Sequence, residues 1–313
     1  MANIATKKKH TVLGIVGDSA TGKTTLTKGI ADILGPDRVT TICTDDYHRY
    51  DRVERSENGL SALDPRCNYI DIMEQHVKQI SEGKPILRPV YSHHDGTLER
   101  PVYEEPKEFI IFEGLLGFTT RSLRDLFDVK VYLEPDEDLR IRWKVDRDTG
   151  KRGYSKEEVM SSLKKRESDS PEFIQPQRTF ADIVVQFYPP KENAEESGAH
   201  LNVSHTLRPT LPHPDLSPIL QSDVQNGLHL ELLRDADGKP VDVLEIPGAI
   251  TDNSAGKLED LIWSLLPEAQ ELRANVGKFT DGSNAPHMSH PLALTQLLIA
   301  YHMVKAQVGV HAI

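Results

Sequence analysis

Residues 17–24 read Gly17-Asp-Ser-Ala-Thr-Gly-Lys-Thr24 and match the pattern G-x-x-x-x-G-K-[ST] at every fixed position. An apolar run precedes the motif at residues 11–16, and a helical pattern follows it at residues 24–34. The motif needs this order, because its glycines let backbone amides approach phosphate oxygens and the start of the helix adds its free amides. The stretch therefore predicts a phosphate-binding loop, and the flanking patterns argue against an accidental glycine turn.

The residues of this loop have separate expected tasks in holding ATP and Mg²⁺. Lys23 is expected to reach the β and γ phosphates, and Thr24 to offer its hydroxyl to the metal. The remaining nucleotide contacts are expected from Gly17, Asp18, Ser19, Ala20, Thr21, Gly22 and Thr25.

Further apolar runs follow the loop, and each ends at polar or turn-forming residues. They cover residues 39–43, 109–112, 129–133 and 183–187, with helical patterns such as 70–82 and 136–147 between them. Alternation of this kind predicts an α/β fold of the P-loop NTPase type, with a mostly parallel sheet and helices on both faces. Ligands in such folds gather at the carboxyl ends of the strands.

Composition changes along the chain predict three segments. They are a flexible N-terminus at residues 1–10, a P-loop kinase domain at 11–190 and a smaller C-terminal α+β extension at 191–313. Within the extension, residues 228–233 and 241–246 flank a turn and predict a hairpin. Helical patterns follow at 257–275 and 291–305.

Charge and cysteine content narrow the functional classes. Lys and Arg total 37 against 48 Asp and Glu, and the net charge of -11 argues against a nucleic-acid-binding scaffold. Cys43 and Cys67 have neither zinc nor redox spacing, which predicts reduced thiols in a cytoplasmic protein. No apolar stretch has the length of a signal peptide core or a membrane span. The oligomeric state stays open, a homodimer included.

Acidic residues follow two of the predicted strands. Glu113 comes directly after the run at 109–112, where an acid would hold Mg²⁺ or its water. Asp45 and Asp46 follow the run at 39–43 and are candidates for the base that deprotonates an acceptor hydroxyl. The alternative for this pair is an ordinary loop or helix cap.

Arginines follow these acids within a few residues. Arg49 and Arg52 are candidates for binding a phosphate already present on the acceptor, because guanidinium groups bind phosphate bidentately. A solvated run of charges is the alternative. His93 and His94 are adjacent in an extended segment without a partner at metal-ligand spacing, so hydrogen bonding to sugar or phosphate is favoured over metal binding.

A second group of cations lies beyond residue 136 and predicts a lid that closes over the transferring phosphates. Residues 147–152 are expected to follow the helix at 136–147, and the alternative is a solvated helix face. The group comprises Arg140, Arg142, Lys144, Arg147, Lys151 and Arg152 with Asp148 among them, followed by Lys164, Lys165 and Arg166.

As an ordered set, these segments resemble the phosphoribulokinases of cyanobacteria and plastids, within the uridine kinase-like group of P-loop kinases. The resemblance covers about residues 10–190. It is carried by Gly17-Asp-Ser-Ala-Thr-Gly-Lys-Thr24, Ile42-Cys-Thr-Asp-Asp-Tyr-His48, Ala62-Leu-Asp-Pro65 with Asn68, Pro89-Val-Tyr-Ser-His93, Phe112-Glu-Gly-Leu115, Arg147-Asp148, Arg152-Gly153 and Pro176-Gln177.

The resemblance implies ATP-dependent phosphorylation of ribulose 5-phosphate to ribulose 1,5-bisphosphate, the acceptor for carbon fixation in the Calvin cycle. Asp45 would be the base and Glu113 the acid at the metal, with Lys23, Arg147 and Asp148 completing the catalytic set. The substrate-binding set would be His48, Arg49, Arg52, Tyr91, His93, Lys144, Arg152 and Arg166. Alternatives are a kinase of another sugar phosphate or of a nucleoside, and a non-catalytic nucleotide-binding regulator.

Two departures from the family pattern bear on regulation and substrate. Plastid members form a disulfide between the positions of Thr21 and Cys43, and Thr21 cannot take part in such a bond. Leu116 stands where the family usually has His or another polar residue. The C-terminal third matches no motif of the family.

Overall fold

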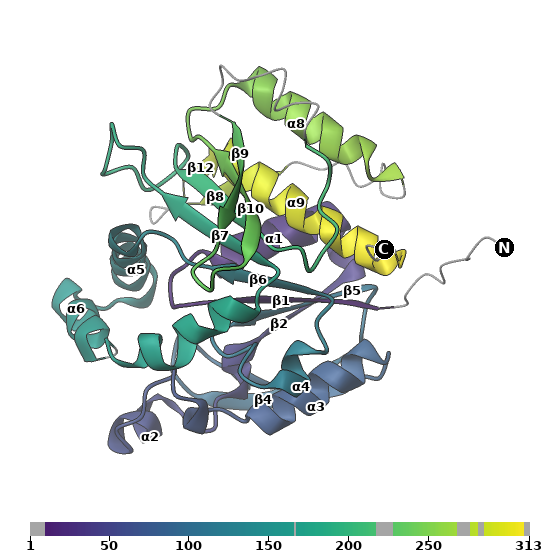
Figure 1. The fold of residues 1–313 in the computed structure, drawn as a ribbon. Coiled ribbons are helices and arrows are strands. Elements are labelled where there is room, and N and C mark those ends of the chain that lie inside the picture. Colours follow the sequence, from purple (N-terminus) through teal and green to yellow (C-terminus); the bar gives the residue numbers. More distant parts are fainter. Residues whose placement is uncertain (1–9, 166, 217–227, 268–275, 281–284, 310–313) are drawn as a thin grey trace.

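A computed structural model gives the fold and describes residues 10–165, 167–216, 228–267, 276–280 and 285–309. Within these residues, a sheet of eight strands runs in the order β2-β5-β1-β6-β7-β8-β10-β9 (Figure 1). The strands are β1 (Thr11–Gly17), β2 (Val39–Cys43), β5 (Phe109–Gly114), β6 (Val129–Leu133), β7 (Ile183–Tyr188), β8 (Asn202–Leu207), β9 (His229–Arg234) and β10 (Pro240–Ile246). Residues 1–9, where a flexible N-terminus was predicted, lie outside the described part.

The first five strands of this order are parallel, and they are the five that the apolar runs predict. All seven residues of β1 are buried. Parallel strands covered on both faces read as continuous apolar runs, which is why the sequence revealed them. The predicted mostly parallel sheet is therefore confirmed.

Helices cover both faces of the sheet and form two hydrophobic cores. On one face lie α1 (Lys23–Leu34), α8 (Asp252–Ser264) and α9 (His290–Gln307), and on the other α3 (Ile70–Ser81) and α4 (Arg121–Arg124). Successive side chains of a strand point to opposite faces. Accordingly, Leu13 and Ile15 belong to the first core, and Val12 and Val16 belong to the second.

The C-terminal strands continue the same sheet. β8 pairs antiparallel with β7, and β10 pairs antiparallel with β8 and β9, so the predicted hairpin is confirmed. α9 agrees with the helical pattern at 291–305, whereas α8 begins and ends earlier than the pattern at 257–275, of which 268–275 lie outside the described part. The domain boundary at residue 190 stays a prediction.

Helices, short helical turns and a hairpin surround the carboxyl ends of the parallel strands (Figure 1). Among them, α5 runs to Arg152 and ends at Gly153, whose φ of 73° suits glycine. The prediction that residues 147–152 follow this helix was therefore wrong. These elements are α2 (Arg52–Glu57), α5 (Glu137–Arg152), α6 (Lys156–Lys165), β3 (Ile86–Tyr91), β4 (Leu98–Glu104), η2 (Thr44–Tyr47), η3 (Pro65–Cys67), η4 (Ser170–Ile174) and η5 (Gln175–Phe180). The remaining short elements are η1 (Pro36–Arg38), β11 (Lys278–Thr280) and β12 (Pro286–Met288).

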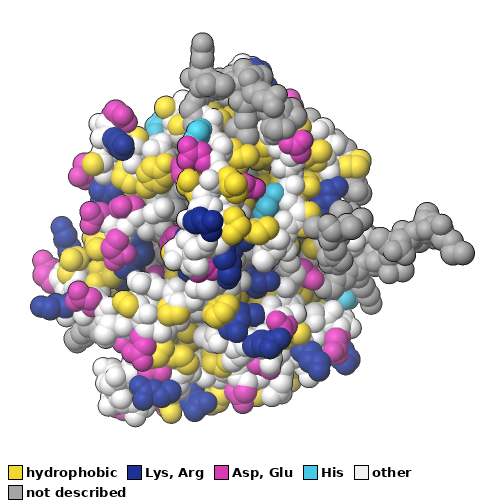
Figure 2. Space-filling model, viewed as in Figure 1, with side chains coloured by type: hydrophobic (Ala, Val, Ile, Leu, Met, Phe, Trp, Pro, Cys, Tyr) yellow, Lys and Arg dark blue, Asp and Glu magenta, His cyan; other side chains and the backbone are white. Residues whose placement is uncertain are grey.

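The surface in Figure 2 mixes cationic and anionic side chains, with hydrophobic ones scattered among them. Among the described residues on this face, no broad patch of one sign is visible. Among the helices of the described ranges, none combines the length and the apolarity that crossing a membrane would take.

Candidate active site

The phosphate-binding motif forms a tight loop between β1 and α1, as its sequence predicts. Gly22 has a φ of 89°, which favours glycine. A Cβ at Gly17 would lie 2.5 Å from the backbone oxygen of Leu133, so the loop packs closely on the end of β6. Ala20 also has a positive φ, 67°, an uncommon conformation for a residue with a side chain.

Lys23 is held at the start of α1 by the loop itself. Its Nζ donates hydrogen bonds to the backbone oxygens of Gly17 (2.9 Å) and Asp18 (2.7 Å). Burial lowers the pKa of Lys23, while the negative charges of Glu113 and Asp45 oppose that shift. The cation therefore lies between the loop and the two acids that the sequence singled out.

Glu113 and Thr24 meet at the mouth of the loop. The Thr24 hydroxyl donates to a Glu113 carboxylate oxygen at 3.2 Å. Burial raises the pKa of Glu113 above its usual value, although the Lys23 charge lowers it. A hydroxyl and a carboxylate at the start of a phosphate-loop helix are ligands that suit Mg²⁺, so the residues present fit the predicted metal.

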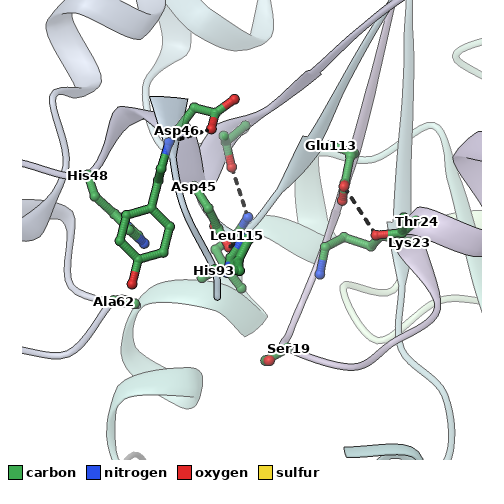
Figure 3. Close-up of polar contacts among 12 residues, drawn as sticks. Ser19, Lys23, Thr24, Asp45, Asp46, His48, Ala62, His93, Glu113 and Leu115 are labelled. Carbon is green, nitrogen blue, oxygen red and sulfur yellow. Dashed lines mark hydrogen bonds and ion pairs between the residues drawn. The ribbon is translucent and has the colours of Figure 1, made fainter. Parts of the chain in front are cut away.

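Asp45 lies in η2, directly beyond the end of β2, and its carboxylate faces His93. The Oδ2 atom of Asp45 is 3.6 Å from Nε2 of His93. Burial raises the pKa of Asp45, but the charges of His48, His93 and Lys23 outweigh it and leave the pKa below its usual value. Figure 3 shows Asp45 and His93 side by side, apart from Lys23 and Glu113.

Aromatic and imidazole rings form the wall beside Asp45. His48 hydrogen-bonds Asn68 at 2.7 Å, and its ring meets Tyr91 edge-on at 4.8 Å between centroids. The Tyr91 ring in turn meets His93 at 5.1 Å. The three rings that the resemblance assigns to the substrate therefore lie together.

The predicted arginines separate into two environments. Arg52 lines the cavity of Asp45 and donates to the backbone oxygen of His93 at 2.7 Å. Arg49 is exposed, stacks on Tyr69 at 4.9 Å from the ring centroid, and is not among the residues lining that cavity. The structure thus brings Arg52, but not Arg49, to the other predicted residues.

Sequence reasoning missed Arg55, which is buried one helical turn after Arg52. Its Nη2 donates to the Tyr91 hydroxyl at 2.7 Å, and its Nη1 donates to the backbone oxygen of Tyr50 at 3.0 Å. Both Arg52 and Arg55 line the cavity. Their spacing of three residues on α2 is the signal that could have shown it, because residues three apart share a helix face.

Helix α5 brings the second cation group to the phosphate loop. Asp148 accepts hydrogen bonds from Lys144 (3.0 Å) and Arg147 (2.8 Å), and Arg152 lies 3.4 Å away. Arg147 also donates to the Ser19 hydroxyl at 3.2 Å. Burial raises the pKa of Asp148, but the bonds from Arg147 and Lys144 leave it below its usual value. Arg166, also predicted to bind substrate, lies outside the described residues.

These side chains surround one cavity of about 1020 Å³ at the carboxyl ends of β1, β2 and β5. Its lining includes Lys23, Thr24, Asp45, His48, Arg52, Arg55, Tyr91, His93, Glu113, Lys144, Arg147, Asp148 and Arg152. Segments far apart in sequence therefore place a phosphate loop, two acids and several cations around one space.

Residues 12–194 match the sequence pattern of the "Phosphoribulokinase / Uridine kinase family". This chain belongs to that family.

Family members with curated names include both kinds of kinase. A phosphoribulokinase from Synechocystis sp. is 38% identical over 178 residues, which are 57% of this chain and 54% of that protein. A uridine kinase from Latilactobacillus sakei is 33% identical over 183 residues, which are 57% of this chain and 86% of that protein. The matched part of this chain thus spans about half the length of the phosphoribulokinase.

The solved phosphoribulokinase from Rhodobacter spheroides shares the fold. It superposes with a TM-score of 0.59 at 21% identity, covering 85% of this chain and 98% of that chain. The coverage extends well past residue 194, so the likeness takes in C-terminal elements as well as the family region.

Leu116 and Thr21, the two residues that depart from the usual family pattern, are both buried. Leu116 is buried in the second core, and Leu115 is the residue that lines the cavity. Thr21 is buried and donates to the backbone oxygen of Asp18 at 3.0 Å, while Cys43 is a free thiol at the cavity. Thr25 lies farther along α1, where its backbone oxygen accepts a bond from Gln296 at 3.4 Å.

Proposed function

We propose that this chain transfers the terminal phosphoryl group of ATP to ribulose 5-phosphate and forms ribulose 1,5-bisphosphate. The observation that carries the proposal is the position of Asp45. Its carboxylate shares one cavity with the phosphate loop on one side and with Arg52 and Arg55 on the other. A base between a phosphate donor site and further cations suits an acceptor that already carries phosphate.

The phosphate loop would hold ATP. Its backbone amides and the start of α1 would bind phosphate oxygens, and the Lys23 ammonium group would pair with the phosphates. Thr24 and Glu113 would hold Mg²⁺, which neutralises charge on the phosphates.

Asp45 would take the proton from the acceptor hydroxyl. Because its pKa lies below the usual value, the carboxylate is ionised at neutral pH and can accept a proton or a hydrogen bond. The nearby His93 ring would orient it, since Nε2 lies 3.6 Å from Oδ2.

The phosphate on the acceptor would bind to cations that the ATP site does not use. Arg52 and Arg152 both line the cavity, and neither contacts the phosphate loop through a hydrogen bond within the described residues. Arg147, by contrast, already reaches Ser19 of the loop and suits the transferring phosphoryl group.

A nucleoside kinase is the second candidate, because a uridine kinase is matched over 86% of its length. Arg52 and Arg55 weigh against it, since a nucleoside has no phosphate for them to bind. A non-catalytic regulator is disfavoured because Asp45, Lys23 and Glu113 all face the cavity. The cytoplasmic location, the homodimer and a role in carbon fixation stay predictions.

The proposal is tested by measuring ADP release with Mg²⁺, ATP and one acceptor at a time. The acceptors are ribulose 5-phosphate, fructose 6-phosphate, uridine and ribulose without its phosphate. Turnover should be fastest with ribulose 5-phosphate and weak with ribulose. Faster turnover with uridine would instead support the nucleoside kinase.

A further inference from the structure

Cys43, Asp45 and His93 form a group of potential metal ligands, and the proposed phosphoryl transfer uses Asp45 and His93 but gives no role to the Cys43 thiol. Their ligand atoms, one sulfur, one carboxylate oxygen and one ring nitrogen, all lie within 4.8 Å of one another. Cys43 ends β2, Asp45 lies in η2 and His93 follows β3. No sequence spacing reveals this group, because His93 is separated from Asp45 by almost fifty residues.

One pair of ligand atoms already has the spacing of a tetrahedral zinc site, and all three lie within 4.8 Å of one another. Zinc bonds of 2.0–2.3 Å in a tetrahedron place neighbouring ligand atoms about 3.5 Å apart. The carboxylate of Asp45 and the ring of His93 already stand at 3.6 Å. All three side chains line the open cavity, so small side-chain rotations would bring in the sulfur and solvent would supply a fourth ligand.

The ligand types distinguish this group from the predicted magnesium site. Thr24 and Glu113 offer only oxygen atoms, which suit Mg²⁺. Thiolate and imidazole favour Zn²⁺ and similar metals over Mg²⁺. The two groups therefore select different ions although they share one cavity.

The local charge also favours a cation at this place. Burial raises the pKa of the Cys43 thiol, and the negative charges of Asp45, Glu113 and Asp46 raise it further, so a metal has to displace the thiol proton to bind the sulfur. The same carboxylates attract a divalent ion. Lys23 opposes this attraction, but it is hydrogen-bonded back to the phosphate loop.

We propose that Cys43, Asp45 and His93 bind Zn²⁺, and that the bound ion blocks phosphoryl transfer by occupying Asp45. On binding, the thiol gives its proton to solvent as the sulfur–zinc bond forms. The carboxylate and the neutral imidazole each donate a lone pair, and nothing is oxidised or reduced. The proposed Zn²⁺ binding is argued from the ligand geometry alone. The proposed inhibition of phosphoryl transfer also rests on the proposed function.

Binding is tested with Co²⁺, which reports a thiolate ligand by a charge-transfer band in the near ultraviolet. Tag-free protein without nucleotide should show this band, and one equivalent of Zn²⁺ should abolish it. Cys43→Ala should lose the band, while Cys67→Ala should keep it, because Cys67 lies in η3 and does not line the cavity. Absence of the band in wild type, or its persistence in Cys43→Ala, would overturn the site.

A second variant guards against misfolding of Cys43→Ala. His93 is half-exposed, so His93→Ala should melt near the wild-type temperature. Its Zn²⁺ affinity should fall at least about 10-fold, since even loss of an outer partner of a ligand costs about 10–100-fold. Unchanged affinity would exclude His93 as a ligand.

Inhibition is measured separately, at free Zn²⁺ fixed by a metal buffer and in saturating Mg²⁺. ADP release should fall, recover on chelation and resist Zn²⁺ in Cys43→Ala relative to that variant's own rate. Full turnover with the site occupied would overturn inhibition. A cobalt–thiolate band in a protein inactive on every acceptor would refute the proposed function and leave the metal site standing.

Discussion

Asp45 and Asp46 are neighbours in the chain, but their carboxylates make different contacts. Asp46 pairs with Arg88 and accepts a hydrogen bond from the backbone N–H of Tyr91 at 2.9 Å, so it ties η2 to β3. Asp45 faces the cavity, and Figure 3 shows Asp46 pointing away from it. The sequence offered both as bases, and the structure leaves Asp45 in position for that role.

Asp45→Asn should retain ATP binding and lose about 10²–10⁴-fold in kcat, because the amide cannot accept the proton. Stopped-flow ADP release and nucleotide titration measure the two properties. Asp46→Asn is the matched control. It should lower the free energy of unfolding by about 1–3 kcal/mol, since the half-buried Arg88 loses one of its two carboxylate partners and keeps Glu104. Equal rates for Asp45→Asn and wild type would remove Asp45 from the catalytic set.

Arg52→Ala should raise KM for ribulose 5-phosphate by about 10–100-fold, the loss of one hydrogen bond between charged groups. Arg49→Ala should leave KM nearly unchanged, because Arg49 stacks on Tyr69 away from the cavity. Steady-state kinetics of the pair separate the two residues. If both variants behave alike, the cavity position of Arg52 does not explain acceptor binding.

Asp235, in the β9–β10 turn, should make the free energy of unfolding depend on pH in the acidic range. Burial raises its pKa, but hydrogen bonds from Arg208 and Arg178 lower it to about 2. The folded-state pKa is depressed, so this stabilisation is present above the unfolded value and is lost as pH falls from about 4 to about 2. Its size at neutral pH is about 2 kcal/mol.

Urea unfolding at neutral pH should therefore show Asp235→Asn destabilised by about 2 kcal/mol and less dependent on pH below 4. Asp237→Asn changes a more exposed carboxylate of the same turn and serves as control. Identical acid profiles for wild type and Asp235→Asn would show that the Arg178 and Arg208 contacts do not stabilise the fold.

Ala20 and Gly22 should respond in opposite directions to exchange of alanine and glycine. Both have positive φ, 67° and 89°. Ala20→Gly should raise the free energy of unfolding by about 1 kcal/mol, and Gly22→Ala should lower it by about 1 kcal/mol or more. Chemical denaturation checks both, and a less stable Ala20→Gly protein would contradict the left-handed conformation of Ala20.

Local patterns revealed the phosphate loop and the parallel strands. The loop is a contiguous motif, and buried strands such as β1 read as unbroken apolar runs. Glu113 and Asp45 could be placed because the carboxyl ends of parallel strands meet at one edge.

Other features depend on packing between distant segments. The spacing of Arg52 and Arg55 places them on one face of α2, but that this face meets the cavity depends on how α2 lies against Tyr91, which no local pattern encodes. The pairing of β8 with β7 joins the C-terminal strands to the main sheet. The sequence of neither strand predicts which strand it pairs with. The group of Cys43, Asp45 and His93 likewise appears only when β3 folds back beside η2.

The proposed reaction phosphorylates the C1 hydroxyl of ribulose 5-phosphate. The most direct measurement follows label from [γ-³²P]ATP into the sugar product of wild type and Asp45→Asn, with uridine as the competing acceptor. We predict labelled ribulose 1,5-bisphosphate from wild type and at least about 100-fold less of it from Asp45→Asn. Little labelled uridine monophosphate should form with either protein. Label appearing in uridine monophosphate instead, or equal label from both proteins, would refute the proposed reaction.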